Sequence, residues 1–415
     1  MKKLFSFLIL VLATSSVFAG GYRVSIQGQK QLAMGHTGVA VISSAETVFF
    51  NPASMAFLED KFNLSVGASG IFSQVKFQNT EFGWTSETDN PLGTPLNLYA
   101  TYKANDWLTF GLGVYTPYGS RVEWEEDWAG SHLVNDIDLS AIFIQPSVSI
   151  KLADFFSIGG GPIYVTGGVN FNRNLSRSLT DDTGENRANV TIDASGINAW
   201  GYNVGWTLKP TDKLTIGFNY RSEITMKAED GDADFENIPP SLGFDDTTFD
   251  SEIPLPSEVT VGLSYQITDK WLAAFDYNRT QWSAYESLNV TFNNAAGTSV
   301  NLRNYSDAST YRFGLQYAHN SKFTFRGGIY FDESPIEDGY FAPETPRGDS
   351  VGYTGGLTYN VTDKLGIDLS FLYLSFKEET NSYDYFVESN GENSSFGGTY
   401  SNSTFAPGIG VSYKF

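Results

Sequence analysis

The chain has 415 residues and carries 47 acidic side chains against 26 basic ones, for a formal net charge of −21. It contains no cysteine, which excludes disulfides, thiolate metal sites and cysteine nucleophiles. The acidic surplus would repel polyanions, so we expect no nucleic-acid partner.

Residues 1–19 have the pattern of a secretory signal peptide. Lys2 and Lys3 precede the apolar run 4–11, and small residues end the stretch at Ala19. We predict cleavage after Ala19 and an exported mature chain.

Residues 20–61 are rich in Gly and Ser and alternate poorly, so they do not read as strands. They contain the apolar sequence FFNPASMAF (49–57), in which Pro52 removes a backbone donor and fixes φ. This sequence would be poorly solvated if it hung in the periplasm. We therefore predict that 20–61 is a hatch, or plug, inside a barrel, centred on Phe49, Phe50, Asn51, Pro52 and Ala53.

Residues 62–415 predict an all-β fold, a 14-stranded antiparallel transmembrane β-barrel. Fourteen stretches alternate apolar and polar side chains, and an even number is typical of bacterial barrels. We expect strands near 62–77, 94–104, 106–119, 135–151, 154–175, 188–209, 212–228, 256–268, 270–292, 308–319, 321–333, 349–361, 363–378 and 403–415.

The alternation is clearest in KLTIGFNYRSEITMK (213–227). It places Leu214, Ile216, Phe218, Tyr220, Ile224 and Met226 on the lipid face. The other face carries Thr215, Gly217, Asn219, Arg221, Glu223, Thr225 and Lys227.

The turns are of two kinds that alternate along the chain. Short ones read ANDW, LADF, PTDK, ITDK, HNSK and VTDK, and long acidic ones cover 78–93, 120–134, 176–187, 229–255, 334–348 and 379–402. Short periplasmic turns and long outer loops are typical of outer-membrane barrels. The last strand ends at Phe415, which resembles the signal read by the barrel insertion machinery. We therefore expect an integral, monomeric protein in the outer membrane of a Gram-negative bacterium.

Several sequence blocks resemble one family in order and spacing. They are NPA (51–53), FGLGVYTPYG (110–119), EWEEDWAG (123–130), YRSE (220–223), QWSAYESL (281–288), YRFGLQY (311–317) and FRGGIYFDESPI (325–336). Together they are similar to the FadL/TodX family of outer-membrane transporters of long-chain fatty acids and hydrocarbons.

The resemblance implies a route for an apolar substrate. In the family, substrate binds between outer loops and then in a pocket inside the barrel. A hatch shift and a kink in the third strand then open a sideways exit into the membrane, with no energy source or cofactor. Here Pro117, Tyr118 and Gly119 interrupt the third strand, because proline cannot donate to a ladder. They form the candidate lateral gate, unless Pro117 only ends the strand at the rim.

Charged residues on the predicted inward faces are candidates for the lumen site. Arg221, Arg312 and Arg326 have this parity. So do Glu223, Asp276, Asp332 and Asp368. They either form structural ion pairs, or one arginine binds a carboxylate ligand. On the thirteenth strand, Leu372, Leu374 and Phe376 also face inward and predict an apolar upper lumen.

The sequence departs from the family's fatty-acid carriers at the two basic head-group positions. Asn289 follows the W-S block, and Phe171 stands near the end of strand five, with Arg173 two residues on and on the same face. We expect long-chain fatty acids as the substrate, with neutral or aromatic hydrocarbons as the alternative.

Three other functions compete with passive uptake: a membrane enzyme, a general porin and an adhesin. An enzyme of the barrel-lipase type needs a Ser–His pair near the rim, but only His132 is expected outside, next to Ser131. His36 and His319 are distant, with no paired metal motif, so we expect neither an enzyme nor a metal site. The clustered hatch phenylalanines disfavour an open pore. The acidic outer loops either are solvated surface or bind divalent cations shared with lipopolysaccharide, which we expect as a partner in the outer leaflet.

Overall fold

The computed structural model describes residues 21–125, 128–175, 187–240, 242–388 and 391–415. The predicted signal peptide, residues 1–19, lies outside these residues.

The strands form one closed antiparallel barrel of fourteen spanning strands, as predicted. β1 (Phe62–Ser69) pairs with β4 (Leu96–Lys103) on one side and with β21 (Asn393–Lys414) on the other, which closes the sheet. The others are β2 (Phe72–Asn79), β3 (Thr85–Glu87), β5 (Leu108–Glu123), β6 (Asp136–Ala153), β7 (Phe156–Asn174), β8 (Asn189–Leu208), β9 (Leu214–Arg221), β10 (Ile224–Glu236), β11 (Thr247–Leu255), β12 (Glu258–Thr268), β13 (Trp271–Thr280), β14 (Ser287–Phe292), β15 (Thr298–Leu302), β16 (Ala308–Ala318), β17 (Phe323–Asp332), β18 (Ser350–Asn360), β19 (Leu365–Phe376) and β20 (Glu379–Val387).

The outward face of the barrel is apolar, as a lipid-facing surface requires. Phe110, Leu263 and Phe313 on different strands are all exposed. Trp107, Phe155 and other large aromatic side chains lie beside the short turns, where a girdle is expected at the membrane interface. The short turns mark the periplasmic end.

Four predicted outer loops proved to be partly sheet. The range 78–93 contains the end of β2 and all of β3, and 120–134 contains the end of β5. The range 229–255 contains the end of β10 and all of β11, and 379–402 contains β20 and the first half of β21. The strands continue here because backbone hydrogen bonds between strands also form outside the membrane, where neither face of the sheet has to be apolar. A further outer connection, 293–307, joins β14 to β16 and includes β15.

One predicted face assignment is wrong. The stretch 212–228 is divided into β9 and β10, and the side-chain parity reverses at Ser222 and Glu223. Ile224 and Met226, expected on the lipid face, are buried inside, and Glu223, expected inside, is exposed. An irregularity between two strands shifts every later side chain to the other face.

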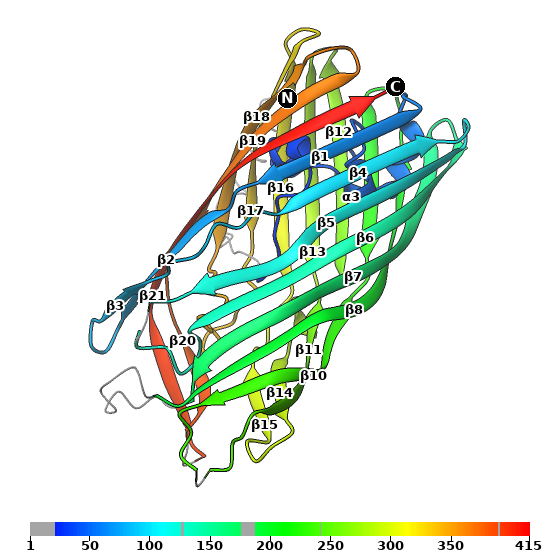
Figure 1. Cartoon of the computed structure of the whole chain (residues 1–415). Helices are drawn as coiled ribbons and strands as arrows, with labels where there is room; N and C mark the ends of the chain where they lie inside the picture. The colour runs from blue at the N-terminus through cyan, green and yellow to red at the C-terminus, as the bar shows by residue number, and fades with distance from the viewer. Residues whose placement is uncertain (1–20, 126–127, 176–186, 241, 389–390) are drawn as a thin grey trace.

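The hatch segment (residues 21–61) lies inside the barrel. It contains α2 (Gln29–Leu32), α3 (Thr47–Phe50) and the 3₁₀ helix η1 (Pro52–Phe57), which packs against β6, β7 and β8. In Figure 1 the blue helices sit within the barrel, toward the end where the C-terminus lies. Between 21 and 58 only Ser43 is exposed. None of the described helices is long and apolar enough to span a membrane.

Candidate functional site: hatch, wall gap and upper cavity

Asn51 fixes the hatch segment to the barrel wall. Its side-chain amide donates to Val39 O at 3.0 Å, to Trp206 O at 3.1 Å and to Thr207 Oγ1 at 3.0 Å. Its Oδ1 accepts from the N–H of Ala53 at 3.2 Å and so caps η1, with Pro52 at the first position where no donor is needed. A Cβ on Gly205 of β8 would lie 2.5 Å from Asn51 Oδ1, so glycine is what lets the segment approach.

The two hatch phenylalanines pack in the lumen against aromatic and cationic groups. Phe49 contacts Phe50 and Tyr115 edge-on, with ring centroids 4.8 Å and 4.9 Å away. The Arg221 guanidinium lies 4.5 Å from the centre of the Phe49 ring and donates to the Phe49 carbonyl at 3.2 Å. Arg221 also lies 3.8 Å from Glu258. It therefore fastens the hatch segment to the wall.

Pro117 breaks the third spanning strand in its interior and not at the rim. β5 continues to Glu123, but its register with β6 shifts between Tyr115 and Tyr118. On its other side, pairing with β4 ends at Leu98–Val114. The next bridge between the two sides joins Thr88 to Trp124. Within these described residues the wall has a gap.

The first residues of the hatch segment fill this gap from inside. Val24 donates its N–H to the carbonyl of Pro117 at 2.8 Å, and the N–H of Gly119 donates to Tyr22 O at 3.0 Å. The Gln27 side chain donates to the Thr116 carbonyl at 2.9 Å. We call residues 21–24 the arm. The arm satisfies backbone groups that β4 leaves unpaired, which apolar surroundings would not tolerate.

Polar side chains of the lumen anchor the arm. Arg23 forms an ion pair of 2.7 Å with Asp332 and lies 3.5 Å from Glu258. It also donates to Thr280 at 2.8 Å. Tyr118 points inward and donates to Glu258 at 2.8 Å, so arm and gate share one buried carboxylate.

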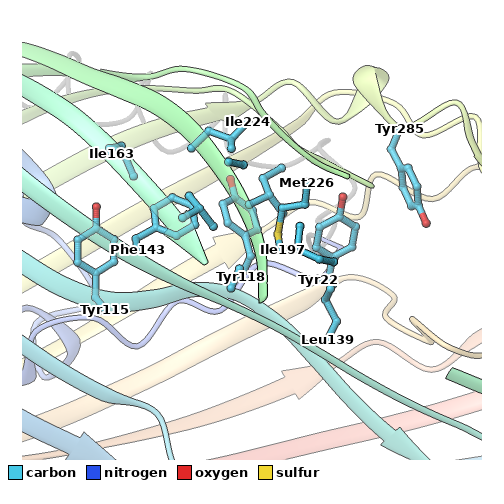
Figure 2. Packing of buried hydrophobic residues seen from close by; sticks show 14 of the residues in the cluster. Tyr22, Tyr115, Tyr118, Leu139, Phe143, Ile163, Ile197, Ile224, Met226 and Tyr285 are labelled. Carbon is cyan, nitrogen blue, oxygen red and sulfur yellow. The ribbon is translucent and has the colours of Figure 1, made fainter. Parts of the chain in front are cut away.

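An apolar cavity of about 90 Å³ lies beyond the arm, toward the outer loops. We call it the upper cavity. Figure 2 shows Tyr22 near Tyr118, with Leu139 and Met226 beside it. The cavity wall also includes Phe171, Val190, Ile197, Phe249, Tyr285, Leu288 and Val290.

The predicted lumen residues lie in four separate environments. Arg173 lines the upper cavity and donates to Ser299 Oγ at 3.2 Å. Arg221 and Arg312 lie at the contact between hatch segment and wall. Arg326 donates to Gln316 at 2.8 Å and to Thr358 at 2.7 Å at the periplasmic end. A side cavity of about 80 Å³ next to the arm is lined by Leu372, Leu374 and Phe376.

The periplasmic end of the lumen is polar and roomy. A cavity of about 470 Å³ there is lined by Lys30, Arg326, Asp363, Lys364 and Lys414, among others. Glu46 of the hatch segment is buried nearby, and burial raises its pKa to about 7 against the opposing effect of Lys30. In the described part of the chain no cluster of potential ligands could hold a metal ion.

Two charged residues of the upper cavity were missed from the sequence. Arg303 and Glu344 form a buried ion pair that lines the cavity, and both come from outer connections. The alternation of apolar and polar side chains predicts which way a residue faces only within a strand, so it cannot predict the position of residues in outer connections. Asn289, by contrast, is exposed, while its neighbours Leu288 and Val290 line the cavity.

These features define a transmembrane β-barrel whose lumen is filled by its own N-terminal segment, with an internal apolar cavity and a gap in its wall. The model of the outer membrane protein transport protein family (OMPP1/FadL/TodX) matches residues 10–415. The chain belongs to this family, and it is an outer-membrane protein.

Relatives are similar over nearly the whole chain. The long-chain fatty acid transport protein of Escherichia coli (strain K12) is 23% identical over 427 residues, covering 94% of this chain and 95% of the relative. Outer membrane protein P1 of Haemophilus influenzae (strain ATCC 51907 / DSM 11121 / KW20 / Rd) is 23% identical over 411 residues, with 89% of each covered. Both values are too low to transfer a substrate residue by residue.

Solved structures show the same fold. A Pseudomonas aeruginosa FadL homologue superposes with a TM-score of 0.81 at 19% identity, covering 95% of this chain and 100% of the homologue. The toluene transporter TodX of P. putida gives 0.73 at 18% identity, covering 96% and 99%.

Proposed function

We propose that this protein takes up hydrophobic molecules passively, with long-chain fatty acids as the first candidate. The substrate binds in the upper cavity and leaves sideways into the outer membrane at Pro117, Tyr118 and Gly119. The observation that carries the proposal is the gap beside β5, which is closed by the arm and not by a neighbouring strand. A seal made by a separate segment can be removed without unfolding the barrel.

Lateral release follows from the solubility of the substrate. A long alkyl chain that left through the periplasmic end would re-expose its methylenes at about 0.8 kcal/mol each. Over a dozen methylenes this exceeds about 8 kcal/mol, the binding free energy of a micromolar ligand. The periplasmic cavity is moreover polar and lined by cations. An exit into lipid avoids both obstacles.

Arg173 favours a carboxylate over a neutral ligand. It is one of two arginines in a cavity whose other inward side chains are mainly apolar. Within the described residues its hydrogen bond to Ser299 leaves donors for a bidentate partner. Neutral hydrocarbons are the second candidate, because Asn289, which directly follows the W-S block, is uncharged and exposed.

The remaining expectations form part of the proposal. We propose that the hatch segment serves as a plug, that the protein acts as a monomer without enzymatic activity, and that Phe415 engages the insertion machinery. We also propose that the acidic outer strands face lipopolysaccharide. An open porin is disfavoured, since residues 21–58 are almost wholly buried in the lumen.

The decisive test compares two arginine substitutions at one height of the barrel. Gly119 and Ser140 are register partners on β5 and β6, but only Gly119 borders the gap. We expect Gly119→Arg to lose most uptake of radiolabelled palmitate per surface copy, with binding by the purified protein retained. Ser140→Arg, exposed on the intact side of the wall, is the matched control. Equal uptake by the two variants would refute release at this strand.

A further inference from the structure

An outer connection folds back into the barrel mouth. We call residues 341–349 the mouth loop; all of them except Arg347 are buried. Trp124 donates its indole N–H to the Pro343 carbonyl at 3.1 Å, and the hydroxyls of Tyr305 and Thr345 are 2.9 Å apart. The loop is thus docked on the residue that follows β5 and on the segment before β16.

The mouth loop carries a carboxylate into the upper cavity. Glu344 forms an ion pair with Arg303, and each side chain is only 6% exposed. Both line the cavity, as does Arg173, which forms no ion pair with a carboxylate of the described residues. A buried ion pair is costly to desolvate, so its presence in an apolar ligand cavity calls for a reason.

We infer that Glu344 occupies the place of the substrate's carboxylate, so that a fatty acid loads the cavity by displacing Glu344 from Arg303. This deepens the proposed function and rests on it. The exchange leaves Arg303 paired with one carboxylate before and after, so no buried cation is left uncompensated. Glu344 leaves for the outer solvent together with its loop.

The size of the cavity requires such a displacement. At about 90 Å³ it is well below the roughly 300–1,000 Å³ of common ligand pockets. The mouth-loop residues Ala342, Glu344 and Thr345 form part of its lining. Withdrawal of this loop therefore enlarges the cavity at the point where the carboxylate would bind.

The same loop holds the arm that closes the gap. Arg347 Nη1 donates to Gly21 O at 3.1 Å and to Arg23 O at 3.2 Å. Ser120 of β5 donates to the Glu344 carbonyl at 3.4 Å. When Glu344 is displaced, these contacts are lost and the arm is weakened. A carboxylate ligand thereby favours the opening of its own exit, and a neutral ligand of the same length does not.

The test measures binding of palmitate and of 1-hexadecanol, which lacks the carboxylate, to the purified full-length protein. In Glu344→Gln the competing charge is gone, so palmitate should bind about tenfold more tightly, the effect of one charge-assisted hydrogen bond. The affinity for hexadecanol should change by less than about twofold. The tenfold change expected for palmitate corresponds to about 1.4 kcal/mol of binding free energy. Glu337→Gln is the matched control, because Glu337 is exposed, bonded to Ser306, and does not line the cavity.

Trypsin cleavage after Arg347 gives a second readout on the unmodified protein. Palmitate should accelerate this cleavage, hexadecanol should not, and cleavage at Lys322, which is exposed in a periplasmic turn, should stay constant as the internal control. If Glu344→Gln does not fold, this measurement alone decides. If palmitate binds but neither the affinity ratio nor cleavage at Arg347 responds, the inference is overturned and the proposed function stands. If palmitate does not bind at all, the inference falls together with long-chain fatty acids as the proposed substrate.

Discussion

Val24 of the hatch segment donates its backbone N–H to the carbonyl oxygen of Pro117 in β5 at 2.8 Å. This bond stands where a neighbouring strand would otherwise continue the sheet. Because Arg23 is anchored to Asp332 beside it, the arm is held both by backbone pairing and by a buried ion pair. The seal of the wall therefore depends on residues that are distant from the barrel strands in sequence.

Val24→Pro should weaken the seal without disturbing the strands. Proline has no N–H, so the bond to Pro117 is lost at a cost of about 1 kcal/mol, which raises the open population of the arm about fivefold. We expect palmitate uptake per surface copy to rise. Val24→Ala keeps the N–H and is the control; indistinguishable uptake by the two variants would show that this bond does not limit release.

The sequence predicts the barrel well because its strands cross a membrane. Lipid on one side enforces alternation in stretches such as Leu214–Tyr220, and the turns mark every return of the chain. Alternation fails at Glu223, where an irregularity reverses parity without a residue that announces it. At Pro117 the comparable irregularity could be expected, since proline cannot donate to the ladder.

The sequence predicts less of the candidate site than of the fold. The phenylalanines and Asn51 of the hatch segment could be singled out because an apolar, proline-broken sequence has no place in a sheet. Arg303 and Glu344 could not, since they are 41 residues apart in irregular connections and meet only after the mouth loop folds inward. The roles of all these residues stay predictions.

Asn51→Ala should loosen the hatch segment while the barrel remains folded. The substitution leaves the buried carbonyls of Val39 and Trp206 without their donor, at a cost of about 1–3 kcal/mol. Hydrogen exchange in peptides covering 45–58 should accelerate accordingly. Asn320→Ala removes the same side chain from a periplasmic turn, where Asn320 caps Lys322 and Phe323. Its hatch peptides should be unaffected, and faster exchange there would indicate a global effect.

Phe218→Arg should destabilise the barrel by about 2–4 kcal/mol, because this side chain faces lipid well away from the turns. Leu152→Arg, on the same face but beside a periplasmic turn, should cost only about 0–1 kcal/mol. Folding titrations into lipid vesicles measure both. A lumen-facing control at Gly217 is unsuitable, since a Cβ there would lie 2.2 Å from the Val39 carbonyl. Equal costs for Phe218 and Leu152 would contradict the assigned depth.

Docking of the hatch segment should weaken as pH rises. Burial raises the pKa of Glu46 from its ordinary 4.5 to about 7, although Lys30 opposes the shift. The docked state therefore favours the protonated carboxyl. Below about pH 4.5 the protonated Glu46 carboxyl makes its full contribution to the stability of the docked state. This contribution is lost as the pH rises through 7, a change of about 3 kcal/mol in the free energy of docking. Hydrogen exchange of the hatch segment, corrected for intrinsic rates, should show more protection at pH 5 than at pH 8. Glu46→Gln should abolish the difference, and a pH dependence that survives this substitution would assign the effect to another group.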